Sequence, residues 1–412
     1  MRIAPNVHPV WMERVWLWSL ALALGCTLGL STSATAAEST GTTPEASPFQ
    51  ACTQPVLPDK VACLEAALSR LIDTVGTETS LTELERLANV DRDVLAESHP
   101  LVHHIGKRTF ARYKTAAEAL SHCTAQFWSG CYHGVLQAYL SSLPQVQPQH
   151  ILSLCPVTEA VPVYSFPRYN CLHGVGHGIT MQFRYDVLKS LAFCDAFPGP
   201  WERESCYGGV FMENIVAFQE ARRAPAGHQH GEGDEHGGGH HGAGPPPTPF
   251  LNPDDLLYPC SVLHDKYLSA CYLMQTSSIL TFTGYDFSRA FPVCAKVPTA
   301  FQVTCARSLG RDISGFTMRQ PDRVRELCAL GNGSQVVECL IGATKDFMLT
   351  DASPEPGLAL CRTVTADQKS ACYATVGEIL LTLLPDRPGR ETVCRRAEAD
   401  YIEACLVSVR EF

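Results

Sequence analysis

The sequence predicts an all-α solenoid of about ten helical hairpins, stapled by as many as nine disulfide bonds. In the C-terminal part of the 412-residue chain, cysteines occur in pairs separated by ten residues, and successive pairs start 34, 34, 33 and 33 residues apart. A fixed period of this length indicates a repeat array, and one helical hairpin per repeat is its usual content. The regular pairs are Cys260 with Cys271, Cys294 with Cys305, Cys328 with Cys339, Cys361 with Cys372, and Cys394 with Cys405.

Each repeat has a short apolar segment that ends at the first cysteine, followed by a longer helical segment that begins near the second. Residues 256–260 illustrate the short segment and residues 271–280 the long one. A disulfide bond would therefore join the end of a short helix to the first turns of a longer helix. The rhythm continues upstream with looser spacing, and a cysteine-free hairpin fits between Leu81 and Tyr113. The upstream pairs are Cys52 with Cys63, Cys123 with Cys131, Cys155 with Cys171, and Cys194 with Cys206.

Stacked hairpins of this kind form a curved, quasi-one-dimensional array with a concave face, and we expect a right-handed superhelix. The array resembles tetratricopeptide and Sel1-like repeats, in its period and its hairpin form only. The concave face of such a scaffold is suited to binding a protein or peptide partner.

The N-terminus has the pattern of an export signal. Arg2 and Arg14 precede an apolar run over residues 15–30, and small residues at 34–36 offer a cleavage site. We therefore expect a signal peptide over residues 1–36, followed by a flexible segment over 37–50. A lipid anchor at Cys26 is an alternative. The 19 cysteines less Cys26 leave eighteen, an even number, and paired cysteines in an oxidising compartment indicate disulfides. The predicted location is periplasmic or secreted.

Charge and hydropathy narrow the range of partners. The formal net charge is -10, and an acidic exported protein is a poor candidate for binding nucleic acid. No segment after the signal is long and apolar enough to cross a bilayer, so we expect no transmembrane segment after signal cleavage.

One face of the long helices changes its chemistry along the array. Counted from the second cysteine at 100° per residue, positions +2 and +6 lie near each other, away from the short helix. In late repeats this face is mostly polar, as at Arg311 and Lys345, and we expect it to face solvent. In early repeats it carries His133, then His173 and His177.

Position +3 of the long helices is small in most repeats. Glycine occupies it in four of them, at Gly134, Gly174, Gly209 and Gly342. This position lies near the cysteine face, so we expect these glycines to let the long helix approach the short helix of its own hairpin closely.

The early histidines are candidate metal ligands. His133, His173 and His177 could converge with His103 or His104 from an upstream helix, and His99 and His122 lie nearby in the sequence. A metal site needs three or four such groups around one point. Met212 could add a soft ligand, and Glu213 is a weak candidate for a catalytic base, about 100° away from the histidine face on a helix. The expected cofactor is Zn, Cu, Fe or haem. A peptide-binding groove without metal, or a purely structural role, are the alternatives.

A histidine-, glycine- and proline-rich segment over residues 222–250 separates the N-terminal repeats (51–221) from the regular C-terminal repeats (251–412). Such a composition predicts a flexible loop. It resembles the histidine-rich loops of metal chaperones and importer-associated proteins, and a solvated insertion with incidental metal affinity is the alternative. Its candidate metal-binding residues are His228, His230, His236, His240 and His241.

Familiar catalytic motifs are missing from the sequence. It has no G-x-S-x-G, P-loop, H-E-x-x-H or C-x-x-C-H pattern, so enzymatic activity stays open and, if present, is expected to depend on a metal. Two functions follow: an exported metal- or haem-binding protein, or a non-enzymatic scaffold that binds a protein or peptide on its concave face.

Overall fold

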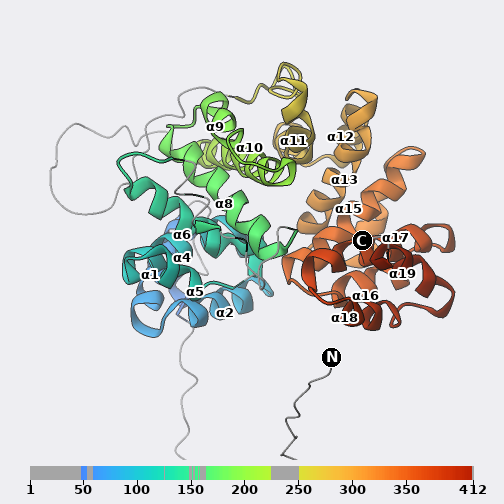
Figure 1. The fold of residues 1–412 in the computed structure, drawn as a ribbon, viewed down its shortest axis with the longest axis horizontal. Helices are drawn as coiled ribbons and strands as arrows, with labels where there is room; N and C mark the ends of the chain where they lie inside the picture. The colour runs from blue at the N-terminus through green and yellow to red at the C-terminus, as the bar shows by residue number, and fades with distance from the viewer. Residues whose placement is uncertain are drawn as a thin grey trace, which may run out of the picture. The chain divides into compact units, whose positions relative to one another are not determined.

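The computed structural model describes residues 48–52, 59–124, 126–147, 151, 154–155, 157, 164–223 and 250–410. Within these residues the chain is helical and contains no β-strand, which confirms the predicted all-α repeat fold (Figure 1). The predicted signal peptide, Cys26 and the five histidines of the 222–250 loop lie outside the described residues.

Two series of helices alternate along the chain. The N-terminal part begins with the 3-10 helix η1 (Gln50–Cys52), α1 (Asp59–Val75), α2 (Thr77–Ala88) and α3 (Arg92–Ala96). The long helices are α4 (Ser98–Tyr113), α6 (Gln126–Ser142), α8 (Phe166–Gln182), α10 (Pro200–Arg223), α11 (Leu268–Thr283), α13 (Thr299–Phe316), α15 (Ser334–Thr350), α17 (Ala366–Leu383) and the shorter terminal α19 (Ile402–Arg410). The short helices are α5 (Ala116–Ser121), α9 (Val187–Cys194), α12 (Phe287–Cys294), α14 (Pro321–Cys328), α16 (Glu355–Thr363) and α18 (Arg387–Cys394), with 3-10 turns η2 (Asp265–Tyr267) and η3 (Ala399–Tyr401).

Nine disulfide bonds close the hairpins, and they join the cysteine pairs expected from the spacing. Their partners are 8 to 16 residues apart in the sequence. The four upstream bridges join Cys52 to Cys63, Cys123 to Cys131, Cys155 to Cys171, and Cys194 to Cys206. The five regular bridges join Cys260 to Cys271, Cys294 to Cys305, Cys328 to Cys339, Cys361 to Cys372, and Cys394 to Cys405.

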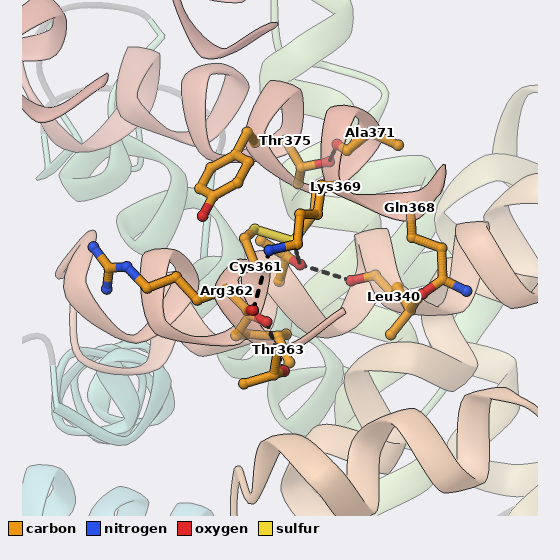
Figure 2. The surroundings of a disulfide bond; sticks show 12 residues. Leu340, Cys361, Arg362, Thr363, Gln368, Lys369, Ala371 and Thr375 are labelled. Carbon is orange, nitrogen blue, oxygen red and sulfur yellow. Dashed lines mark hydrogen bonds between the residues drawn. A yellow bond between two sulfur atoms is a disulfide. The ribbon is translucent and has the colours of Figure 1, made fainter. Parts of the chain in front are cut away.

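The bridges act within repeats and not between them. Figure 2 shows the bridge at Cys361, where Nζ of Lys369 also donates to the carbonyl oxygen of Arg362 at 3.2 Å. Because each bridge lies within one hairpin, none of the nine links one repeat covalently to the next.

Neighbouring repeats are held together by contacts between successive long helices, from α4 and α6 through to α17 and α19. Glycines let these helices approach closely. A Cβ atom on Gly134 would lie 2.0 Å from the carbonyl oxygen of His103, and one on Gly209 would lie 1.9 Å from that of His173. The expected partner of these glycines was the short helix of the same hairpin. That expectation is wrong, because the glycines face the preceding long helix.

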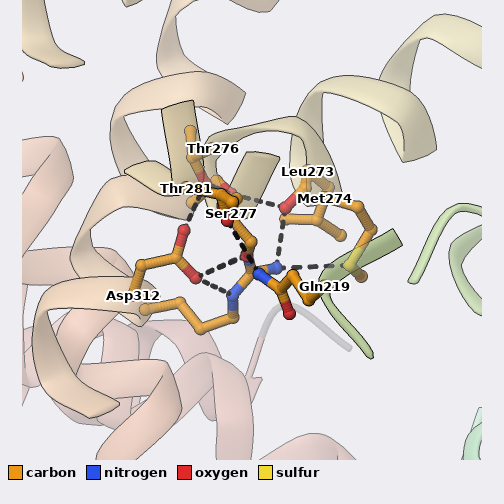
Figure 3. A network of polar contacts seen from close by, with 9 residues as sticks. Gln219, Leu273, Met274, Thr276, Ser277, Thr281 and Asp312 are labelled. Atoms are coloured by element: carbon orange, nitrogen blue, oxygen red, sulfur yellow. Dashed lines mark hydrogen bonds and ion pairs between the residues drawn. The ribbon is translucent and has the colours of Figure 1, made fainter. Parts of the chain in front are cut away.

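The polar face of the late repeats is also a contact between repeats. Arg311 of α13 donates to the carbonyl oxygen of Leu273 on α11 at 2.7 Å, and its side chain is only 17% exposed. Asp312 accepts hydrogen bonds from Thr276 at 2.7 Å and Ser277 at 3.0 Å (Figure 3). The expectation that this face points into solvent is therefore wrong at Arg311, because successive long helices cover it.

Candidate metal centre

Four histidines from three successive long helices meet at one point. His99 and His103 of α4, His133 of α6 and His177 of α8 each offer a ring nitrogen, and these four atoms all lie within 4.8 Å of one another. Nitrogen ligands at 2.0–2.1 Å from a tetrahedral ion are about 3.4 Å apart. The two Nε2 atoms of His99 and His103, at 3.0 Å, are already close to that separation. Small side-chain movements would bring the other nitrogens to it.

Local sequence explains how the rings come together. His99 and His103 are four residues apart, so they share one face of α4. Glycines remove side-chain bulk beside the rings: a Cβ atom on Gly130 would lie 3.2 Å from Cδ2 of His103, and one on Gly174 would lie 3.2 Å from Cδ2 of His133. The cluster therefore depends on the same close packing of long helices that holds the repeats together.

Three of the four histidines are buried, and three of their ring nitrogens have no hydrogen-bond partner among the described residues. His103, His133 and His177 are 4%, 2% and 0% exposed. Both ring nitrogens of His133 and Nε2 of His177 have no hydrogen-bond partner among the described residues. A buried polar atom without a partner costs about 1–3 kcal/mol, so such atoms are rare unless something binds them. Converging orphan nitrogens are what a metal site requires of its ligands.

Outer hydrogen bonds orient two of the rings. Nδ1 of His177 donates to Oε2 of Glu213 at 2.8 Å, and Nε2 of Gln137 donates to the same oxygen at 2.9 Å. Nδ1 of His99 lies 3.0 Å from the carbonyl oxygen of Phe127. A proton on Nδ1 leaves the Nε2 lone pair free to face the centre, which is the usual arrangement around a metal-bound histidine.

Burial keeps the imidazoles neutral. It lowers the pKa of His103, His133 and His177 well below the ordinary value, and neighbouring imidazoles lower these pKa values further. Burial also lowers the pKa of His99. Neutral imidazole is the form that binds metal. Burial raises the pKa of Glu213 to about 7, while the nearby charge of Lys107 opposes that rise.

The structure brings together three of the predicted ligands, His103, His133 and His177. His173 lies beside them, with its ring centroid 5.1 Å from that of His133 and 5.0 Å from that of His177. Its Nδ1 is 3.4 Å from the hydroxyl of Tyr169, and it is not one of the four converging residues.

The other predicted residues make different contacts. His104 points away from the cluster toward α1, where its Nε2 is 2.8 Å from Oγ of Ser69. Met212 packs against the apolar core. Glu213 does reach the cluster, but it does so through its hydrogen bond to His177. His99 was not among the predicted ligands, although its spacing of four from His103 matches that of His173 and His177.

Comparisons with protein-family models, curated proteins and solved structures gave no match.

Among the helices of the described residues, none has the length and apolar character needed to cross a membrane.

Proposed function

We propose that this chain is an exported protein that binds one transition-metal ion through His99, His103, His133 and His177. One observation carries the proposal: four imidazole nitrogens from three helices lie within 4.8 Å of one another. It is supported by buried nitrogens on two of these residues that have no hydrogen-bond partner within the described part of the chain. The nine disulfides and the signal-like N-terminus support export to an oxidising compartment.

The ligand set favours a bare ion over haem. In five of the six pairs of these histidines, the ring centroids are only 4.4 to 5.7 Å apart, so these rings contact one another and leave no room for a macrocycle between them. Imidazole ligands suit Zn²⁺, Cu²⁺ and Fe²⁺. Met212 is partly buried and packs against the apolar core.

Binding rather than hydrolysis is the activity that this geometry supports. Four protein ligands complete a tetrahedral shell, whereas catalytic zinc sites keep one position open. The ligands come from three hairpins that no disulfide joins to one another, so an ion would cross-link them. The alternative of a peptide-binding groove gains no support at these residues, because three of the four histidines are buried.

Metal analysis of the full mature chain, purified without a histidine tag, tests the proposal. We expect one tightly held equivalent that survives dialysis and is lost in His133→Ala. The matched control His104→Ala removes an imidazole from α4 that points away from the cluster, and it should keep the ion. A second preparation without residues 227–244 separates any weaker binding by the loop. Absence of a tight ion, or its retention in His133→Ala, would contradict the proposal and turn attention to a protein partner.

A further inference from the structure

The four proposed ligands differ in their access to the outside. His103, His133 and His177 are buried, whereas His99 is partly exposed. The ring of His133 contacts those of His99, His103, His173 and His177. Among the histidines that the structure describes, the ring of His99 contacts only those of His103 and His133. His99 therefore lies at the edge of the cluster, on the side that faces out.

The segment that holds His99 is strained. Nδ1 of His99 is 3.0 Å from the carbonyl oxygen of Phe127, in the first turn of α6. Phe127 has φ 51° and Ser129 has φ 58°, a region that residues other than glycine rarely adopt. Oγ of Ser129 is also buried without a hydrogen-bond partner in the described part of the chain. Backbone strain of this kind tends to occur where a segment has a functional reason to rearrange.

The opposite side of the cluster is closed and well bonded. His177 is fully buried and is held by Glu213, which also accepts a hydrogen bond from Gln137. Backbone-to-backbone packing at Gly176 and Gly209 joins α8 to α10 directly behind this residue. Of the two sides, the one at His99 is partly exposed, and the hydrogen bond between His99 and the carbonyl oxygen of Phe127 holds the ring there.

On these grounds, and resting on the metal-binding function proposed above, we propose that the ion enters and leaves past His99. His99 is the exchangeable ligand, and His103, His133 and His177 form the retained set. The site would then pass its ion to and from a chelating donor or acceptor in its surroundings, and would not hold it permanently. The exchange is a ligand substitution in which one metal–nitrogen bond is replaced by a bond to the incoming chelator, with no change of oxidation state.

Release of Co²⁺ to excess EDTA tests this route in the full, disulfide-bonded chain. His99→Ala and His103→Ala form a matched pair, because each removes one imidazole from the same face of α4. If the ion leaves past His99, the rate of Co²⁺ release should be several-fold higher in His99→Ala than in His103→Ala, because His99 still blocks the exit in His103→Ala. His99→Gln keeps a bulkier side chain than His99→Ala, so its release rate should lie between those of wild type and His99→Ala. Release from His103→Ala that is as fast as from His99→Ala would overturn the inference.

Chemical labelling provides a readout on the metal-free protein. Among the five histidines of the cluster region, ethoxyformylation should reach His99 first, and bound Co²⁺ should protect it. The reference is His122, which lies outside the cluster and is partly exposed. Labelling of His133 or His177 as fast as His99 would overturn the route while leaving the metal site intact. Failure of the wild-type chain to bind Co²⁺ would instead overturn the proposed function itself.

Discussion

The early and late repeats share the same contact between long helices but place different side chains at it. Late in the chain, protein groups satisfy the charged residues at that contact: Arg311 pairs with Asp312 at 2.7 Å, and Asp312 accepts from Thr276 and Ser277 of the preceding long helix. Early in the chain, the equivalent face carries imidazoles, and ring nitrogens of His133 and His177 have no partner among the described residues. The same helix contact therefore occurs in both regions. The side chains at that contact determine whether its polar groups bond to each other or are left without a partner.

An acidic residue seven places after the second cysteine recurs in both regions. Glu213, Asp312 and Asp346 occupy this position after Cys206, Cys305 and Cys339. Glu213 accepts from His177 of the preceding long helix, and Asp312 accepts from Ser277. His177 and Ser277 themselves lie at the same +6 position of their repeats. A single repeat-to-repeat contact therefore orients a histidine in one region and completes a polar network in the other.

The largest expected difference between the two regions is their response to an ion. Zn²⁺ at 1,000 times its dissociation constant should stabilise the folded state by about 4 kcal/mol. Because the ligands lie on α4, α6 and α8, slowed hydrogen exchange should concentrate in these helices and be small in α15 and α17. Hydrogen exchange with and without Zn²⁺, read by mass spectrometry, checks this. Equal protection along the whole array would contradict the distinction between the regions.

Removal of one ligand should weaken binding strongly. His177→Ala deletes a ring that is buried and aimed at the centre, and we expect the Zn²⁺ dissociation constant to rise by more than about 100-fold, beyond what loss of an outer-sphere group causes. Competition titration against a chromophoric chelator measures it. Arg311→Ala changes the +6 position of a late repeat and serves as the control, with unchanged Zn²⁺ affinity. A comparable loss in both variants would point to a global effect on folding.

The hydrogen bond from His177 to Glu213 should matter less than the ligand itself. Glu213→Gln keeps the size of the side chain but removes its charge, and a 10- to 100-fold loss of Zn²⁺ affinity is typical for an outer-sphere carboxylate. The disulfide map and helix content should not change. An unaltered dissociation constant would show that Glu213 satisfies a buried histidine without supporting an ion.

The smallest expected effect lies in the late repeats and depends on pH. Burial raises the pKa of Asp346 from 3.8 to about 7. A raised folded-state pKa means that the stability contributed by this group is fully present below pH 3.8 and is lost as the pH rises through about 7. Asp346→Asn removes the ionised form, so it should stabilise the chain increasingly over that window.

The shift in the pKa of Asp346 sets an upper bound of about 4 kcal/mol on the stabilisation by Asp346→Asn at pH 8. We expect a stabilisation of about 1 kcal/mol, because the fold can relax around a buried charge. Urea unfolding of Asp346→Asn and wild type from pH 4 to pH 8 measures the effect. Asp351→Asn, a partly exposed carboxylate paired with Arg319, is the control. A stability difference that does not vary with pH would show that Asp346 is not ionised at high pH in the folded chain.

The fold was predictable because the cysteine spacing reports the repeat directly. The histidine cluster was only half predictable. Angles around one helix place His133 and His177 on a common type of face, but they do not say which side chain of the next helix lies opposite. Glu213 is only a weak candidate in the sequence because it lies about 100° from the +2/+6 face of its own helix, whereas its partner, His177, is on the preceding helix. Comparison with Asp312 and Asp346 at the same repeat position carries that information.

His99 and His104 illustrate the remaining limit. Both lie in the first two turns of α4, and neither falls in a cysteine-defined register, so the repeat pattern does not say which of them points toward the other histidines. The structure decides it through packing: α4 lies between α1 and α6, with His104 toward Ser69 of α1 and His99 toward Phe127 of α6.

X-ray absorption spectroscopy of the protein loaded with one equivalent of Zn²⁺ tests the four-histidine centre most directly. We expect a shell of four nitrogen ligands at about 2.0–2.1 Å, with the multiple scattering of imidazole rings and without sulfur, and the loss of one imidazole in His133→Ala. A shell with sulfur, fewer than three imidazoles, or a spectrum unchanged by that substitution would contradict it.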